Sequence, residues 1–274
     1  MAGDPVLETD LHAAIAAGLA SHEHLLACFD FDGTLAPIVD DPARARALQA
    51  TEGHLEALSG SDRVSTAVVS GRALNDVVGR IDGLDVYAGN HGLELKRNGS
   101  VTVHPIADRR ASRIDRCCDR LTDRLEQVDG CRLENKRLTA TVHYRQVPTH
   151  ALPTVRKAVH EVAETVGNGT LQVTRGKAIL EIGPRVHWSK GHAVSLLRDR
   201  HAGDPFVLFV GDDVTDESAF RRIEPDGLAI AVDRGADTDA SHVLSSPRAV
   251  EELLAWLRRH LEATAFVDSD LSHA

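Results

Sequence analysis

Two aspartates near the start of the chain have the type and spacing to share the work of phosphoryl transfer. Asp30 and Asp32 follow the apolar run Leu25 to Phe29 and precede Gly33 and Thr34. Carboxylates two residues apart at a strand end point to the same side, and a glycine lets the chain turn away from them. One carboxylate of such a pair can attack phosphorus to form an acyl phosphate, while its neighbour donates a proton to the leaving oxygen and later takes one from water. A lone Asp-x-Asp is also common as a capped turn, but the flanking residues favour the catalytic interpretation.

A second group of acids could supply the positive charge that such chemistry needs by holding a metal ion. Four acidic residues follow the apolar run Phe206 to Val210: Asp212, Asp213, Asp216 and Glu217. Their hard oxygen ligands suit Mg²⁺, and a cation is needed because a phosphoryl group is negatively charged. We expect Asp212 to be the main ligand, with Asp30 and the main-chain carbonyl of Asp32 completing the protein's share. Some of the four acids are expected only to form the acidic start of a helix near Thr215.

Two further residues have the chemistry to bind the transferred phosphoryl group. Ser70 directly follows the run Thr66 to Val69, so its hydroxyl and the next amide, at Gly71, can hold a phosphoryl oxygen. Lys190 stands at the start of a helical segment and offers a point charge. Each signal is weak by itself, because Ser-Gly-Arg is often a plain turn and a lone lysine usually faces solvent. Their order along the chain between the two acidic groups favours phosphoryl binding.

These residues would be positioned by short apolar runs that each end in small, polar or acidic residues. The runs are Leu25 to Phe29, Thr66 to Val69, Phe206 to Val210 and Leu228 to Val232. Such runs are typical of buried parallel strands, and ligands in an open α/β sheet bind beyond the strands' carboxyl ends. Segments of helical period lie between them: Ala43 to Leu58, Ala73 to Ile81, Lys190 to His201 and Arg248 to Thr264. The sequence therefore predicts an α/β fold with a Rossmann-like, doubly wound parallel sheet.

The middle of the chain has a different pattern, which predicts an inserted α/β domain over residues 108–184. The expected elements are a helix over Asp108 to Val128, a strand over Arg137 to Tyr144, a helix over Thr149 to Val166, and strands over Thr170 to Thr174 and Ala178 to Ile182. Their order is roughly α-β-β-α-β-β, with turns at 134–136 and 175–177. Residues 1–107 and 185–274 would then form the two parts of the core domain. Met1 to Leu7 and Asp268 to Ala274 are expected to be loose ends.

Composition excludes several classes of protein. The 274 residues carry a net charge of −10, which disfavours nucleic-acid binding. The sequence contains no apolar run of the ~18 residues that a membrane span needs, and the acidic start lacks a leader pattern, so we expect a cytoplasmic protein. The four cysteines, Cys28, Cys117, Cys118 and Cys131, lack metal or disulfide spacing and are expected to be small buried hydrophobes.

With these motifs assembled, the chain resembles the haloacid dehalogenase superfamily of phosphohydrolases. The four motifs of that superfamily match Asp30 to Leu35, Ser70, Lys190, and Gly211 to Asp216. The resemblance implies that Asp30 is the nucleophile, Asp32 the acid and base, and Asp212 a Mg²⁺ ligand, with Asp213 or Asp216 supporting the metal site. It also implies that Ser70 and Lys190 bind the phosphoryl group. The insert lies between the second and third motifs, as in members with an α/β cap that closes over the substrate.

Within that superfamily, the chain from about Leu25 to Leu257 is similar to trehalose-6-phosphate phosphatases. The supporting stretches are 69–72, 89–94, 134–136, 143–145 and 176–181. The resemblance implies that the sugar is bound by Glu134, Lys136 and Glu181 of the cap and by Arg72, Asn90 and His91 of the core. The stretch Arg185 to Trp188 departs from the family pattern near the expected hinge.

The sugar-binding assignment also has a physical basis, and its alternatives remain open at this level. A disaccharide needs charged and amide groups on fixed turns, although the same cap residues could be surface salt bridges worth about 0 to 1 kcal/mol each. The first hypothesis is a Mg²⁺-dependent phosphatase that hydrolyses trehalose 6-phosphate to trehalose and phosphate, coupled functionally to a trehalose-6-phosphate synthase. The second keeps the chemistry with another sugar, such as sucrose phosphate. The third is a non-catalytic regulator that binds a sugar phosphate, which the presence of every catalytic residue disfavours.

Overall fold

The computed structural model describes residues 5–224, 226–235 and 237–271. The chain divides into two compact units: Thr102–His187 form one, and the described residues up to Val101 and from Trp188 onward form the other. No helix within the described ranges is long and apolar enough to cross a membrane.

The first unit is built on an eight-stranded sheet of order β12-β11-β10-β1-β2-β3-β4-β5. The strands are β1 (Leu25–Phe29), β2 (Val64–Val69), β3 (Val86–Gly89), β4 (Glu94–Arg97), β5 (Ser100–Val103), β10 (Phe206–Gly211), β11 (Leu228–Val232) and β12 (His242–Leu244). β1 pairs in parallel with both β2 and β10, and the strands from β12 to β3 are all parallel. From β1, the sheet grows towards β2 and β3 on one side and towards β10 and β11 on the other. The carboxyl end of β1 is therefore at a topological switch point, where ligands bind in such sheets.

Helices cover both faces of this sheet, as the continuous apolar runs require. Leu25, Ala27 and Phe29 of β1 pack on one side and Leu26 and Cys28 on the other, because side chains alternate along a strand. The first side is covered by α1 (Pro5–Ser21), α2 (Gln49–Ser59), α3 (Leu74–Val78) and α8 (Pro247–Leu271). The second is covered by α6 (Lys190–Asp199) and α7 (Glu217–Ile223). The predicted doubly wound sheet is therefore confirmed.

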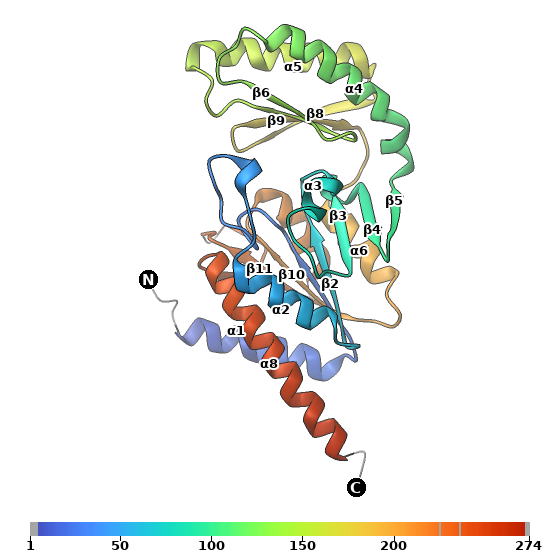
Figure 1. The fold of residues 1–274 in the computed structure, drawn as a ribbon, viewed down its shortest axis with the longest axis vertical. Helices are drawn as coiled ribbons and strands as arrows, with labels where there is room; N and C mark the ends of the chain where they lie inside the picture. Colours follow the sequence, from blue (N-terminus) through green and yellow to red (C-terminus); the bar gives the residue numbers. More distant parts are fainter. Residues whose placement is uncertain (1–4, 225, 236, 272–274) are drawn as a thin grey trace. The chain divides into compact units, whose positions relative to one another are not determined.

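The second unit is a four-stranded antiparallel sheet of order β6-β7-β9-β8 with two helices on one face (Figure 1). Its elements are α4 (Pro105–Leu125), β6 (Arg132–Asn135), β7 (Ala140–His143), α5 (Leu152–Gly167), β8 (Leu171–Gly176) and β9 (Ile179–Pro184). The order α-β-β-α-β-β is the predicted one. Ala140 and Val142 of β7 and Leu180 and Ile182 of β9 pack into the core formed with α4 and α5. The residues between them, including Thr141 and Glu181, therefore project from the opposite face of the sheet.

Several predicted boundaries are wrong for identifiable reasons. The helix expected over Ala43 to Leu58 is a short 3₁₀ turn, η1 (Pro42–Arg44), followed by an extended segment before α2. That segment is held by a backbone hydrogen bond from Leu48 to the carbonyl of Leu35, which local periodicity cannot reveal. Residues 5–7 and 268–271 were expected to be loose, but they continue α1 and α8, while residues 1–4 and 272–274 lie outside the described residues.

Two smaller corrections concern the segments near the predicted sites. The helix expected over Ala73 to Ile81 is only the five-residue α3, because Gly79 ends it. Glu134 and Asn135, expected in a turn, belong to β6, since their backbone pairs with β7.

Candidate active site

The Asp30 carboxylate is placed by the β1–β10 pairing. The Asp30 amide donates to the carbonyl of Val210 over 2.8 Å and so extends the ladder one residue beyond β1. The chain then turns tightly, because the Phe31 carbonyl accepts from the amides of Leu35 and Ala36 at 3.0 and 2.9 Å. The turn keeps Asp30 nearly buried, with 5% of its surface exposed, beside the end of β10.

Two glycines allow the two acidic loops to approach closely. Gly33 has φ +81°, and a Cβ on it would overlap the carboxylate of Asp212. Gly211, the last residue of β10, would likewise press a Cβ against the Asp216 carboxylate. Thr34 adds a hydroxyl at 3.4 Å from Asp212 Oδ1. Glycine is therefore needed at both positions to let the carboxylates sit against the backbone.

Lys190 joins the acidic loops from the start of α6. Its Nζ lies 2.9 Å from Asp30 Oδ1 and 2.7 Å from Asp216 Oδ1, and the lysine is 2% exposed. The other Asp216 oxygen, Oδ2, accepts from the amide of Asp213 at 2.9 Å, and the Asp213 side chain in turn caps the 3₁₀ turn η4 (Val214–Asp216). Both oxygens of Asp216 are thus engaged by the protein, which fits a supporting position better than that of a main ligand.

The electrostatics of this cluster follow from burial and crowding. Burial raises the pKa of Asp30 well above its ordinary range. The Lys190 ammonium acts in the opposite direction, while the neighbouring carboxylates Asp216 and Asp212 raise the pKa further, and the net shift is upward. Burial and the charge of Asp216 raise the pKa of Asp212 to about 7. Burial lowers the pKa of Lys190, but the charges of Asp216 and Asp30 more than offset it, so the net shift is upward and the ammonium stays charged.

The cluster has the composition of a divalent-cation site. Asp30, Asp212 and Asp216 each offer a carboxylate oxygen, and these three atoms lie within 4.8 Å of one another. When all three carboxylates are ionised, they and the Lys190 ammonium leave two excess negative charges in a largely buried place. This arrangement is costly unless a cation compensates the charges, and the same cost of burying charge raises the pKa values of Asp30 and Asp212. Hard oxygen ligands of this kind fit Mg²⁺. The three atoms are all side-chain oxygens, and the main-chain carbonyl of Asp32 stays a predicted further ligand.

Ser70 and Gly71 lie at the end of β2 and are tied to the loop that follows β3. The Ser70 amide donates to Ala88 over 2.9 Å, and the His91 amide donates to the Ser70 carbonyl over 2.8 Å. A Cβ on Gly71 would meet the His91 ring at 2.7 Å, so the ring packs directly on this turn. His91 itself has φ 58°, within η2 (Asn90–Gly92). The predicted phosphoryl-binding turn is therefore braced by one of the predicted substrate-binding residues.

Asn90, predicted to bind the sugar, lies in the interior of the first unit. It is fully buried, and its Nδ2 donates to Oε1 of Glu94 over 2.6 Å. The same Glu94 oxygen accepts from the amide of Leu74 at 3.1 Å, at the start of α3. Glu94 was not singled out from the sequence as a separate site residue, and only the fold shows that this buried carboxylate connects the loop after β3 to α3.

Arg72 contacts Asp32, one of the two candidate catalytic aspartates. Its Nε and Nη2 lie 2.6 Å from Asp32 Oδ2 and Oδ1 respectively, and its Nη1 lies 2.7 Å from Asp76 Oδ2. Nothing in the sequence spacing of Asp32 and Arg72 indicates this pairing, since the residues stand forty positions apart.

In the second unit, the predicted cap residues gather on the sheet face opposite the helices. Thr141 lies opposite Glu134 on one side and Glu181 on the other. Lys136 Nζ and Thr141 Oγ1 each lie 3.3 Å from Glu181 Oε2, and His143 Nε2 lies 3.0 Å from Glu134 Oε2. The structure thus brings Glu134, Lys136 and Glu181 into one polar row that also includes Thr141 and His143.

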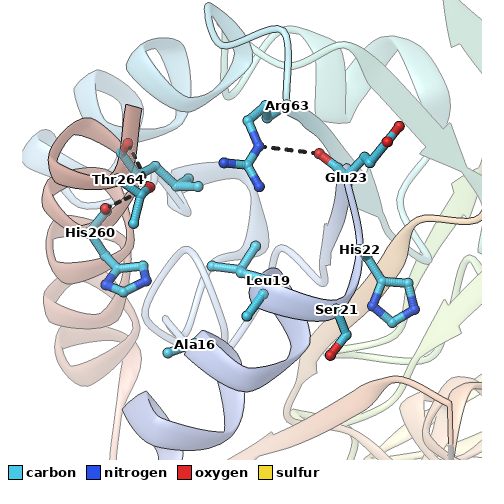
Figure 2. A pocket seen from close by; sticks show the side chains of 10 residues that line it. Ala16, Leu19, Ser21, His22, Glu23, Arg63, His260 and Thr264 are labelled. Carbon is cyan, nitrogen blue, oxygen red and sulfur yellow. Dashed lines mark hydrogen bonds between the residues drawn. The ribbon is translucent and has the colours of Figure 1, made fainter. Parts of the chain in front are cut away.

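A hollow of about 410 Å³ lies at the other, amino end of the β1 and β2 strands (Figure 2). Its lining comes from α1, α8 and the segments before β1 and β2, and Arg63 Nε donates to the carbonyl of Glu23 over 3.2 Å beside it. Glu23 is the sole carboxylate among its described lining residues. Its described lining therefore differs from the carboxyl edge of the sheet, where the predicted phosphoryl-transfer residues gather.

The chain is similar to known proteins in both sequence and fold. A family model for trehalose-phosphatase matches residues 28–252. The trehalose-phosphate phosphatase of Mycobacterium ulcerans is 33% identical over 243 residues, covering 85% of this chain and 61% of the relative, so the chain spans about three fifths of the length of that curated relative. The C-terminal domain of the C. albicans trehalose-6-phosphate phosphatase superposes with a TM-score of 0.75 at 25% identity, covering 90% of this chain and 96% of that one.

A more distant likeness extends the comparison to the fold alone. A haloacid dehalogenase-like hydrolase from Bacteroides thetaiotaomicron superposes with a TM-score of 0.61 at 13% identity, covering 85% of this chain and 99% of that one. The α/β fold class expected from the sequence is therefore confirmed. Because the family model matches most of the chain, from the end of β1 into α8, the protein belongs to the trehalose-phosphatase family.

Proposed function

We propose that the protein is a Mg²⁺-dependent phosphatase that hydrolyses trehalose 6-phosphate to trehalose and phosphate through an aspartyl-phosphate intermediate. The observation that carries this proposal is the buried cluster in which Lys190 contacts both Asp30 and Asp216 beside Asp212. Such a cluster supplies a nucleophile, a fixed cation and a metal site at one strand edge. The substrate is supported by the family and by the printed names of the relatives.

In the first half of the proposed reaction, an oxygen of Asp30 attacks phosphorus while the bond from phosphorus to the sugar oxygen breaks. Asp32 donates a proton to that sugar oxygen, so trehalose leaves as a neutral alcohol. Ser70, the Gly71 amide and Lys190 hold the phosphoryl oxygens that gain charge. Each of these groups lies on a loop or helix start at the carboxyl edge of the sheet.

In the second half, Asp32 takes a proton from water as the water oxygen attacks phosphorus of the acyl phosphate. The bond between phosphorus and Asp30 breaks, phosphate leaves, and both carboxylates return to their starting state. Asp30, Asp212 and the carbonyl of Asp32 would hold Mg²⁺, with Asp213 and Asp216 in support. When bound, the ion would neutralise the excess charge of the cluster and of the phosphoryl oxygens.

We further propose that residues 108–184 act as a cap that recognises the sugar through Glu134, Lys136 and Glu181. These polar groups form part of one row on the sheet face opposite the helices, as hydrogen bonding to sugar hydroxyls requires. Arg72, Asn90 and His91, also expected at the sugar, all lie at or beside the proposed phosphoryl-binding turn. The Arg72 amide donates to Ser70 Oγ over 3.2 Å, and the Asn90 amide donates to the Arg72 carbonyl over 2.7 Å. The His91 ring packs on Gly71. The proposed reaction is the last step of trehalose biosynthesis and so follows a trehalose-6-phosphate synthase.

The test is phosphate release from trehalose 6-phosphate, sucrose 6-phosphate, glucose 6-phosphate and an aryl phosphate, with Mg²⁺ and with EDTA. We expect strong preference for trehalose 6-phosphate, loss of turnover in EDTA, and recovery when Mg²⁺ is added back. Mg²⁺-dependent release from a different sugar would keep the chemistry and discard the substrate. No release from any compound would discard the enzymatic proposal.

A further inference from the structure

Arg72 forms a bidentate salt bridge, the Arg72 fork, with the carboxylate of Asp32. Nε of Arg72 lies 2.6 Å from Oδ2 of Asp32, and Nη2 lies 2.6 Å from Oδ1, so both carboxylate oxygens accept from the same guanidinium. Two parallel, charge-assisted hydrogen bonds fix the orientation of both planar groups, whereas a single contact would leave the carboxylate free to rotate.

The Arg72 guanidinium also contacts three groups other than Asp32. Its Nη1 donates to Asp76 Oδ2 over 2.7 Å, and its Nη2 also donates to the carbonyl of Pro42 over 2.9 Å. Its carbon Cζ lies 5.4 Å from the centre of the Phe31 ring, in a cation–π contact. The Arg72 side chain is 10% exposed, whereas that of Asp32 is 36% exposed. A largely buried guanidinium thus supports a carboxylate that is partly exposed to solvent.

Asp76 also binds a second arginine, Arg80. Arg80 donates from Nε to Asp76 Oδ2 over 2.9 Å and from Nη2 to Oδ1 over 2.7 Å. Arg80 also donates to the carbonyls of Ala43 and Ala45. Asp76 is therefore shared by two arginines, of which Arg72 touches Asp32 and Arg80 makes no hydrogen bond to it among the described contacts. Both arginines bind Asp76, but only Arg72 binds Asp32 among the described contacts, so Arg80 provides a matched control.

We propose that Arg72 is the positioning residue for Asp32 and acts on catalysis through that carboxylate rather than through the sugar. The proposal rests on the proposed function, because it presumes that Asp32 exchanges protons with the leaving oxygen and with water. An acid or base must stand about 2.6 to 3.2 Å from the atom it serves, and a displacement of about 1 Å can cost about 100-fold in rate. The two hydrogen bonds from Arg72 fix the orientation of the carboxylate that must reach that distance.

The proposal predicts a dependence on the leaving group that a purely structural role would not produce. A sugar alkoxide is a poor leaving group and needs the proton from Asp32, whereas p-nitrophenolate is stable enough to leave without it. The ratio kcat/KM reports events up to transfer of the phosphoryl group to Asp30. Loss of Asp32 positioning should therefore reduce kcat/KM for the sugar phosphate far more than for p-nitrophenyl phosphate.

The experiment compares R72M, R72K, D32N, the double variant R72M/D32N and the control R80M in the full chain with Mg²⁺. We expect R72M to lower kcat/KM by about 100-fold with trehalose 6-phosphate and by less than about 10-fold with p-nitrophenyl phosphate. R72K should fall between R72M and the unchanged protein, since an ammonium cannot form the fork. R80M removes an equivalent guanidinium from Asp76 and should stay within about 3-fold on both substrates.

The double variant tests whether the two residues act as one unit. If Arg72 works through Asp32, adding R72M to D32N should cost no more than about 3-fold beyond D32N alone. Equal losses on the two substrates, or full additivity in the double variant, would overturn the proposal. Either result would indicate that Arg72 contacts the substrate or merely stabilises the loop.

A crystal structure of R72M provides a readout that does not depend on turnover. We expect the Asp32 carboxylate to leave the position that it occupies beside Arg72, while Asp30 and Lys190 keep their 2.9 Å contact. An Asp32 carboxylate that stays in place without the fork would refute the positioning role even if the unchanged protein hydrolysed none of the tested phosphates. Failure of the proposed function itself would appear separately, as absence of phosphate release from the unchanged protein.

Discussion

Gly33 and Asp212, 179 positions apart in the sequence, lie so close that a single added methyl group on Gly33 would overlap the Asp212 carboxylate. The contact links the turn after the two proposed catalytic aspartates to the loop after β10. It also gives a way to perturb the proposed metal ligand without changing any acidic residue.

G33A should therefore weaken the metal site. The new methyl group must displace Asp212, so we expect the Mg²⁺ concentration for half-maximal phosphatase activity to rise by about 10- to 100-fold. The matched control is G99A, because Gly99 also has a positive φ (+76°) but a Cβ there would meet nothing within 4 Å. Both variants carry a similar backbone strain of about 1 to 2 kcal/mol. A Mg²⁺ requirement that is the same in the two variants would contradict the role of the contact.

D30N should abolish turnover and leave the fold intact. The substitution is nearly isosteric but replaces the proposed nucleophilic oxygen with an amide, so we expect kcat to fall by at least about 10³-fold. Far-ultraviolet circular dichroism and the melting temperature should stay close to those of the unchanged protein. Normal turnover by D30N would eliminate the aspartyl-phosphate mechanism.

Acid should progressively remove the stabilisation that Asp76 provides. Burial raises the pKa of Asp76, but hydrogen bonds from Arg80 and Arg72 outweigh it and hold the pKa below the ordinary value of 3.8. A carboxyl whose pKa is lower in the folded state stabilises the fold fully above its unfolded pKa, and this contribution fades as pH falls through the folded pKa. The difference in melting temperature between the unchanged protein and D76N should be constant from pH 7 to 5 and shrink below about pH 4.

The control for this measurement is D204N, since Asp204 pairs with Arg198 at 2.9 Å but has a 71% exposed side chain. That exposed pair should contribute little at any pH. A D76N difference that grew in acid would show that its arginine partners do not favour the charged form of Asp76.

Substitutions in the polar row of the second unit should separate sugar recognition from chemistry. E134A and K136A should lower kcat/KM at least about 10-fold more with trehalose 6-phosphate than with p-nitrophenyl phosphate, because groups that bind the sugar are unused by the aryl substrate. K157A is the control, since Lys157 lies on α5 with its side chain 76% exposed. Equal losses on both substrates would argue against the proposed cap function.

The candidate site residues could be predicted from the sequence, because each is indicated by the residues next to it in the chain. Strands β1 and β11 match the expected runs residue for residue, since a buried parallel strand is a continuous apolar run. The acids, the serine and the lysine stand directly at strand or helix boundaries, where a polar residue after an apolar run is conspicuous. The second unit's element order was likewise predictable, because α4 and α5 carry a clear apolar face.

Tertiary structure alone decided which of these residues touch. Short strands such as β4, β5 and β12 have few buried residues, so their pattern did not distinguish them from loops. The segment before α2 follows a backbone bond to Leu35 rather than its own helical period. The pairing of Lys190 with Asp216, and the fork of Arg72 on Asp32, depend on parallel strands bringing distant loops to one edge. Residue type and local spacing therefore determined the chemistry available to this protein, whereas long-range pairing decided which charges meet and which carboxylate is held in place.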